Sequence, residues 1–182
     1  MIEGDPRRVV VLGVTGSGKT TAGARIARAI GARHVELDAL YWGPNWTAGE
    51  PEAFREQVRA AIEGCERWVT DGGYATIVMD ITWVHADAIV WLDYPLWLTM
   101  WRLFRRTTGR IARGVELWAG NRESIRSQFL SRDSLFSWAW TTHKKYRVSY
   151  PEHFARPELA GVRVLRFRQP RAFEAWVREL ET

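Results

Sequence analysis

The residues with the clearest chemistry lie at 13–20, where the chain reads Gly-Val-Thr-Gly-Ser-Gly-Lys-Thr. This segment matches the phosphate-binding loop (P-loop) pattern G-x-x-x-x-G-K-[ST] at every fixed position. Glycines let such a loop wrap closely, so that backbone N–H groups point at an anion, and the following helix adds its positive end. We expect Lys19 to reach the β- and γ-phosphates of a nucleotide and Thr20 to hold Mg²⁺. The predicted nucleotide-contacting residues of the loop are Gly13, Thr15, Gly16, Ser17, Gly18, Lys19, Thr20 and Thr21.

Two aspartates follow runs that are typical of buried strands, and both are candidates for phosphate-transfer chemistry. Asp71 comes directly after the run 67–70, where a carboxylate can hold Mg²⁺ through water; the other interpretation is a turn residue. Asp38 follows the run 34–37 and can orient or deprotonate an acceptor hydroxyl, or else serve only as a helix cap. Glu36 is interpreted as a solvated side chain.

Arginines carry most of the positive charge. The chain has a formal net charge of +5, and 23 of its 26 basic residues are arginines. Five of them, and no acidic residue, lie within 102–113: Arg102, Arg105, Arg106, Arg110 and Arg113. A mobile segment bearing such side chains can stabilise charge on a transferred phosphate and exclude water, so Arg106, Arg110 and Arg113 are candidate catalytic residues. The alternative is a set of solvated surface arginines.

The elements that must position these residues are predicted by their apolar patterns. Short apolar runs predict five strands, at 9–12, 34–37, 67–70, 88–92 and 162–167. Helical patterns alternate with them, at 20–30, 51–64, 95–106, 124–146 and 170–181. This alternation predicts an α/β fold, a three-layer doubly wound parallel sheet in a single domain over residues 1–182. Poor periodicity at 107–126 predicts a mobile arginine-rich lid inserted there.

Tryptophan is abundant, with 11 residues. Trp97 and Trp101 are four residues apart in a predicted helix, and we expect them to pack in the core. Trp42 and Trp46 lie in a loop near Asp38, where they either pack structurally or form an aromatic wall over a planar acceptor.

Length and composition exclude several classes of protein. At 182 residues, 46% hydrophobic and 26% charged, the chain is typical of one globular domain and not of a disordered or fibrous protein. No apolar window approaches 18 residues, so no membrane partner is expected. The single Cys65 excludes an internal disulfide and a cysteine-rich zinc site. Residues 1–8 do not resemble a secretory signal, and a cytoplasmic location is expected.

Several segments together resemble a known family. They are the P-loop, Leu-Asp-Ala-Leu-Tyr-Trp at 37–42, Trp-Val-Thr-Asp-Gly-Gly-Tyr at 68–74, Trp-Leu-Asp-Tyr-Pro at 91–95, and the Trp-Arg and Arg-Arg pairs at 101–102 and 105–106. They resemble the DNA topology modulation (FlaR-like) P-loop proteins, small relatives of adenylate kinase, and the similarity spans nearly the whole chain. It implies a P-loop NTPase of the nucleoside and nucleotide kinase type, with a five-stranded parallel sheet of order 2-3-1-4-5 and a lid. It also implies that Arg102 and Arg168 lie near the adenine of ATP and Arg106 near its phosphates.

Three functions follow from these observations. The leading hypothesis is a kinase that transfers the γ-phosphate of MgATP to a small-molecule or nucleotide acceptor. Adenylate kinases follow their Asp-Gly pair with an aromatic-Pro-Arg that grips AMP, whereas this chain has Gly73-Tyr74-Ala75, so AMP is not predicted. The rival is a nucleotide-gated regulatory protein that contacts DNA, weakly and with salt dependence, or a protein partner through its basic lid. A simple NTPase without an acceptor is the third.

Overall fold

The computed structural model describes residues 5–121 and 135–182, and its central element is a parallel sheet. The strand order β2-β3-β1-β4-β5 and the α/β class confirm the sequence prediction. The strands are β1 (Arg8–Leu12), β2 (Arg33–Glu36), β3 (Trp68–Asp71), β4 (Ala88–Leu92) and β5 (Arg163–Phe167). The helices are α1 (Lys19–Ile30), α2 (Leu37–Tyr41), α3 (Pro51–Ile62), α4 (Ala75–Thr82), α5 (Leu96–Arg113), α7 (Leu135–Phe154) and α8 (Pro170–Leu180). Short 3-10 turns are η1 (Pro44–Trp46), η2 (Trp118–Gly120) and η3 (Pro157–Leu159).

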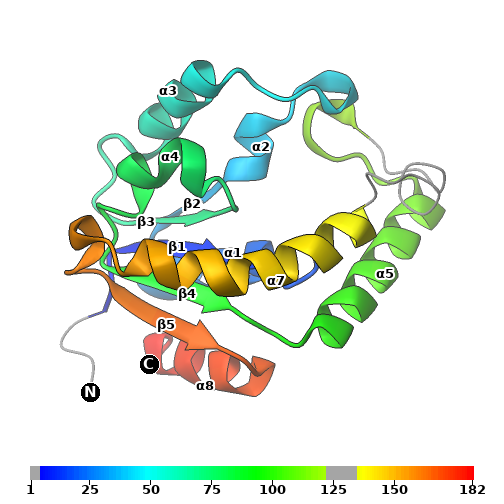
Figure 1. The fold of residues 1–182 in the computed structure, drawn as a ribbon. Helices are drawn as coiled ribbons and strands as arrows, with labels where there is room; N and C mark the ends of the chain where they lie inside the picture. The colour runs from blue at the N-terminus through cyan, green and yellow to red at the C-terminus, as the bar shows by residue number, and fades with distance from the viewer. Residues whose placement is uncertain (1–4, 122–134) are drawn as a thin grey trace.

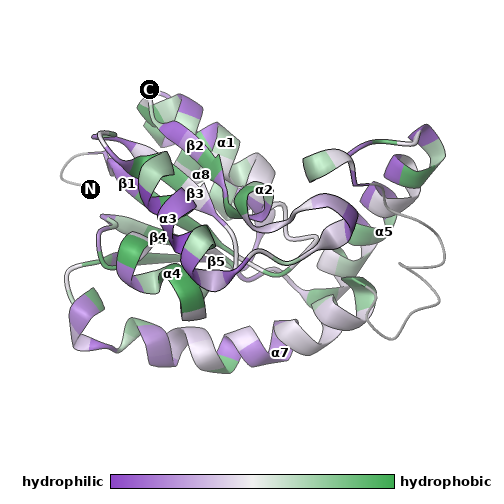
Figure 2. Ribbon diagram, turned by 90° about the horizontal axis from the view of Figure 1, so that it is seen from above, coloured by the Kyte–Doolittle hydropathy of each residue, from purple (hydrophilic) through white to green (hydrophobic). Residues whose placement is uncertain are grey.

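The central strands β1, β3 and β4 are buried on both faces, which explains their nearly continuous apolar runs, whereas the edge strands β2 and β5 are partly exposed. On one face, Val9 and Val11 of β1 pack with α1 and α8. On the other, Val10 and Leu12 belong to a core that includes Trp83, after α4, and Tyr150 of α7. Figure 2 shows the resulting three layers, with α1 and α8 on one side of the strands and α7 along the opposite side.

The register of the sheet places the polar residues at the C-terminal ends of β2 and β3 next to each other and beside the end of β1. Val11 of β1 lies opposite Asp71 of β3, and Glu36 of β2 lies opposite the same Asp71. Leu12 lies opposite Trp91 of β4 on the other side. Figure 1 shows α5 beyond this end of the sheet and α7 running across its front. In open α/β sheets, ligands bind at the carboxyl ends of the strands, so a ligand site is expected between this edge of the sheet and helices α5 and α7.

Helix α5 is longer than predicted, and the predicted end at residue 106 is wrong. It continues to Arg113 and ends at Gly114, which adopts a left-handed φ of 58°. Its buried residues Thr99, Leu103 and Thr107 recur every four positions, so one packed face extends beyond the region where the apolar pattern fades. Residues 107–113 are therefore helical. Residues 114–121 of the predicted lid include the turn η2, residues 122–126 lie outside the described residues, and a mobile lid stays a prediction.

Other helices also differ from the boundaries predicted from the sequence. The helix predicted at 124–146 extends to Phe154, with Pro151 in its last turn, and its residues 124–134 lie outside the described part of the chain. The short helices α2 and α4 were not predicted, because each has too few residues for a clear helical period.

The prediction that Trp97 and Trp101 pack in the core is wrong. Their exposed fractions are 71% and 52%, because the opposite face of α5 is the one that packs. The Arg105 guanidinium lies 4.7 Å from the centre of the Trp101 ring, an exposed cation–π contact. Within residues 5–121 and 135–182, no helix combines the length and hydrophobicity that crossing a membrane requires.

Candidate active site

The P-loop connects β1 to α1, as predicted, and its glycines are required by close packing. Gly16 has a φ of 81°, and a Cβ placed there would lie 2.6 Å from the carbonyl oxygen of Thr99 on α5. Gly13 has a φ of 157°, and a Cβ there would lie 2.5 Å from Ser17 Oγ. Lys19 is the first residue of α1, so the free N–H groups of a helix start face the same region. The loop therefore has the geometry of an anion site.

Thr20 and Asp71 are brought together across 51 residues of sequence. The Thr20 hydroxyl donates to Asp71 Oδ1 at 3.0 Å, and Asp71 is only 2% exposed. Its second oxygen lies 2.7 Å from His34 Nε2, a neighbour on β2 that the sequence did not indicate. Mg²⁺ prefers oxygen ligands and retains several waters, so a hydroxyl and a carboxylate beside a phosphate loop fit this ion. Metal binding by this pair stays a prediction.

Two arginines of α5 contact the loop directly. Arg102 Nη1 donates to the carbonyl oxygen of Ser17 at 3.1 Å, and its guanidinium lies 5.2 Å from the centre of the Tyr94 ring. Burial raises the pKa of Tyr94 to about 12, so this phenol stays neutral beside the guanidinium. Arg106 Nη2 lies 3.5 Å from Thr15 Oγ1. We call this region, formed by the P-loop, Asp71, Arg102 and Arg106, the phosphate end.

The other predicted arginines are placed differently. Arg110 lines the same cavity as Arg102 and Arg106. Arg113 does not; its Nε donates to the Gly109 carbonyl at 3.0 Å on the exposed surface of its own helix. Arg168 is 70% exposed and is also absent from the lining. Catalytic or nucleotide contacts of Arg113 and Arg168 stay predictions.

A cavity of about 1420 Å³ continues from the phosphate end to a second region beside α2. Asp38 lies there, in the first turn of α2, and its Oδ1 accepts a hydrogen bond of 2.6 Å from the Tyr74 hydroxyl. Burial, followed by the Asp38 charge, raises the pKa of Tyr74 far above its ordinary value, so Tyr74 remains a donor. Asp38 and Lys19 thus line one continuous space.

Aromatic rings form the wall around this second region. Trp42 and Trp46 meet edge to face with ring centres 6.0 Å apart, and Trp46 meets Trp118 in the same way at 6.4 Å. All three line the cavity, together with Tyr41. The hypothesis of an aromatic wall near Asp38 thus has the geometry it needs, with Trp118 as an unpredicted third member. We call the region formed by Glu36, Asp38, Trp42, Trp46 and Trp118 the aromatic end.

Glu36 belongs to this wall, and its interpretation as a solvated side chain is wrong. Its Oε2 accepts a hydrogen bond from the Trp118 indole Nε1 at 3.3 Å, and it lines the cavity. Asn121 holds the surrounding turns in place: its Oδ1 accepts from the Trp46 backbone N–H at 3.0 Å, and its Nδ2 donates to the Gly43 carbonyl at 2.9 Å. No sequence pattern signals these contacts, which join residues 75 or more positions apart.

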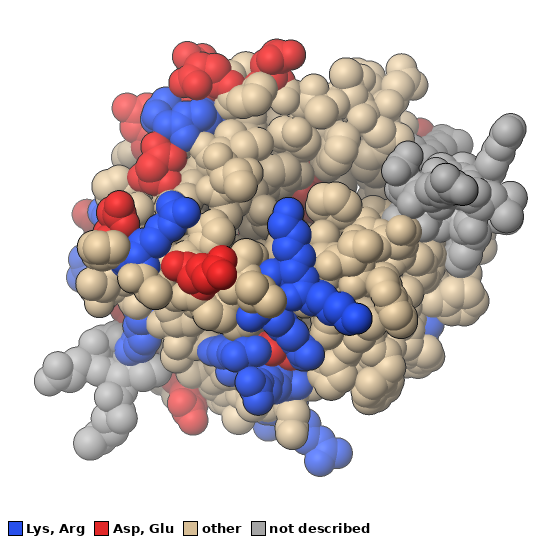
Figure 3. All heavy atoms as spheres, in the orientation of Figure 1, with Lys and Arg blue, Asp and Glu red and all other residues tan. Residues whose placement is uncertain are grey.

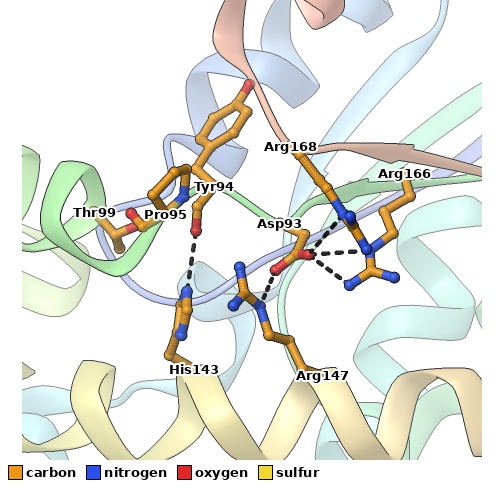
Figure 4. Close-up of polar contacts among 8 residues, drawn as sticks. All are labelled: Asp93, Tyr94, Pro95, Thr99, His143, Arg147, Arg166 and Arg168. Atoms are coloured by element: carbon orange, nitrogen blue, oxygen red, sulfur yellow. Dashed lines mark hydrogen bonds and ion pairs between the residues drawn. The ribbon is translucent and has the colours of Figure 1, made fainter.

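A buried carboxylate with three arginines anchors α7 beside the cavity. Asp93 follows β4, and its carboxylate accepts hydrogen bonds of 2.7 Å from Arg147 of α7 and from Arg166 of β5 (Figure 4). The Nε atom of Arg168 lies 3.9 Å from the same carboxylate. Close by, His143 Nε2 lies 3.0 Å from the Tyr94 carbonyl oxygen. Figure 3 shows basic side chains gathered on the face where α7 and β5 lie. No charge partner of Asp93 was predicted, because its three arginines lie 54 or more residues away in the sequence.

Comparisons with known proteins agree with this architecture. No family model matches the chain. A shikimate kinase from Thermosynechococcus vestitus is 32% identical over an alignment of 108 residues that covers 52% of this chain and 58% of that kinase. The solved shikimate kinase from Acinetobacter baumannii, in complex with shikimate, has a TM-score of 0.55 at 14% identity, covering 96% of this chain and 90% of its own. The shikimate kinase from Bacteroides thetaiotaomicron has the same TM-score at 18% identity, covering 97% of both chains. The chain has the α/β P-loop fold of the shikimate kinases.

Proposed function

We propose that the chain is an ATP-dependent kinase that transfers the γ-phosphate of MgATP to the hydroxyl group of a small molecule. The observation that carries this proposal is the single cavity lined by both the P-loop and Asp38. A carboxylate that shares a cavity with the phosphate loop can serve an acceptor, a role that simple nucleotide hydrolysis does not need.

Each side chain has a defined task in this reaction. Lys19 and the loop N–H groups hold the β- and γ-phosphates, while Arg106 and Arg110 offset the negative charge that develops during transfer. Asp38 accepts the proton of the acceptor hydroxyl. As it does so, the hydroxyl oxygen forms a bond to the γ-phosphorus while the bond between that phosphorus and the leaving ADP oxygen breaks. Thr20 and Asp71 would hold Mg²⁺, which supplies further charge neutralisation on the phosphates.

The similarity to shikimate kinases supports the proposal without naming the acceptor. The 32% identity over 108 residues and the shared fold favour a small-molecule kinase. Arg102 and Arg106 turn toward the P-loop, which favours a role in nucleotide binding over the rival role in DNA contact. Membership of the FlaR-like group and a cytoplasmic location stay predictions from the sequence.

The test is transfer from MgATP to a panel of hydroxyl metabolites, nucleosides and nucleoside monophosphates, followed by ³¹P NMR. We expect one phosphorylated product with the unaltered protein and none with Lys19→Ala. Lys144→Ala is the matched control, because Lys144 is exposed and lies outside the cavity lining. ATP binding without transfer to any compound would contradict the proposal, and so would normal turnover by Lys19→Ala.

A further inference from the structure

The two ends of the cavity differ sharply in charge. The positive side chains that line it come from α1, α5 and α7: Lys19, Arg102, Arg106, Arg110, Lys145 and Arg25, the last of which is paired at 2.5 Å with the lining acid Glu174 of α8. On the wall formed by the end of β2, α2, η1, η2 and the residues that begin α4, the charged lining residues are both acidic, Glu36 and Asp38. The phosphate end therefore suits a polyanion, whereas the aromatic end repels one.

Neither carboxylate is neutralised by a basic partner in the part of the chain that the structure describes. Glu36 is hydrogen-bonded by an indole N–H and Asp38 by a phenol O–H, both neutral donors. Both residues are half-buried. Each carboxylate keeps further acceptor positions that a ligand with a positive charge or N–H donors can occupy.

The aromatic rings point to the same ligand chemistry independently of the carboxylates. The ring of Trp46 is nearly perpendicular to the rings of both Trp42 and Trp118, with interplanar angles of 77° and 87°. All three tryptophans line the cavity, and an ammonium group is attracted to the face of an indole ring. The Glu36 carboxylate accepts a hydrogen bond from the indole N–H of Trp118, so the negative charge lies next to the aromatic rings.

We propose that the acceptor is a hydroxyl compound that carries an ammonium group, such as an amino alcohol or an amino sugar. Its ammonium group lies against the indoles of Trp42, Trp46 and Trp118 beside the Glu36 carboxylate, and its hydroxyl reaches Asp38. This inference rests on the proposed kinase function and adds the class of acceptor. Carboxylate acceptors are disfavoured by the same charges.

The experiment compares matched compounds that differ in charge: glucosamine, glucose and gluconate, and then 2-aminoethanol, ethylene glycol and glycolate. Binding to the full chain is measured without nucleotide by saturation-transfer NMR, and phosphate transfer is measured separately with MgATP. We expect the amine of at least one set to bind about 100-fold more tightly than its neutral and anionic counterparts, because one desolvated cation–π contact and one charge contact each contribute about tenfold.

Two variants assign the preference to this wall. Glu36→Gln keeps the side-chain shape and should reduce the preference for the amine about tenfold, the effect of one charge contact. Glu63→Gln, at an exposed acid outside the cavity, should leave it unchanged.

The outcomes separate the two proposals. Equal or tighter binding of the neutral or anionic compounds, or binding of none of the six, overturns the ammonium inference. Transfer of phosphate to gluconate or glycolate overturns it too, but leaves the kinase proposal standing. Selective amine binding without transfer to any compound supports the ammonium site and counts against the kinase.

Discussion

The phosphate end and the aromatic end share one cavity but are built in different ways. Most of the phosphate end comes from eight consecutive residues, and its backbone conformation is fixed locally by glycines such as Gly16. The aromatic end is assembled from the end of β2, α2, η1 and η2, and Asn121, next to η2, bonds Trp46 of η1 and Gly43 across 75 or more residues. A site for phosphate, a group common to many substrates, needs only backbone N–H groups and charge. A site for one acceptor needs side chains placed in three dimensions.

Among the variants that separate the two ends, the largest effect is expected at Asp38, the residue of the aromatic end that serves the acceptor hydroxyl. Asp38→Asn should lower kcat by roughly 10²- to 10⁴-fold, because a general base is lost, while the Kd of ATP stays unchanged. Stopped assays with the accepted compound and fluorescent ATP-analogue binding measure the two quantities. Tyr74→Phe is the companion variant, since it removes the hydrogen bond to Asp38 but keeps the carboxylate. Full kcat in Asp38→Asn would refute the base role.

A variant within the phosphate end should affect ATP alone. Arg106→Ala removes a charged donor beside Thr15 and should weaken ATP binding by about 10- to 100-fold, as for a lost charge-assisted hydrogen bond. Acceptor binding in the absence of nucleotide should not change. Arg105→Ala is the control, because Arg105 is exposed and does not line the cavity. If both substrates weakened equally, the two ends would not be separable.

A variant that loosens the aromatic end should have the opposite selectivity. Asn121→Ala loses hydrogen bonds to Trp46 and Gly43, so acceptor binding should weaken about tenfold, with the Kd of ATP unaltered. Isothermal titration of each substrate tests this separation. An unchanged acceptor affinity would show that η1 and η2 keep their positions without this side chain.

The smallest effect is expected far from both ends, at the Arg55–Asp80 ion pair. The hydrogen bond from Arg55 lowers the pKa of Asp80, so the pair stabilises the fold above the ordinary Asp pKa, and this contribution is lost as pH falls through the lowered value. Because Asp80 is 59% exposed, Asp80→Asn should cost at most about 0.5 kcal/mol at pH 7. Urea unfolding at pH 7 and in acid measures the difference, which should vanish in acid. A cost that persisted there would mean that the charge is not its source.

Features that depend on contiguous residues were predicted from the sequence, whereas features that depend on contacts between distant residues were not. The five strands and the P-loop were predicted, because runs such as 9–12 and the spacing of glycines before Lys19 are properties of contiguous residues. Thr20 and Asp71 were each predicted to hold Mg²⁺, and the structure places the Thr20 hydroxyl on the Asp71 carboxylate, while metal binding by them stays a prediction. The end of α5 was not predicted, because Leu103 and Thr107 continue a buried face whose partner is another part of the chain.

The sequence by itself determined that this chain has a phosphate-binding loop on a parallel sheet. Only the tertiary structure decided that Glu36 faces a cavity beside Trp118, that Asp93 gathers arginines from α7 and β5, and that Trp97 lies on the surface. The physical reason is the range of the forces involved. A loop that wraps an anion is specified by the φ angles of neighbouring residues, whereas charge pairing and aromatic packing depend on which distant side chains the fold brings within contact.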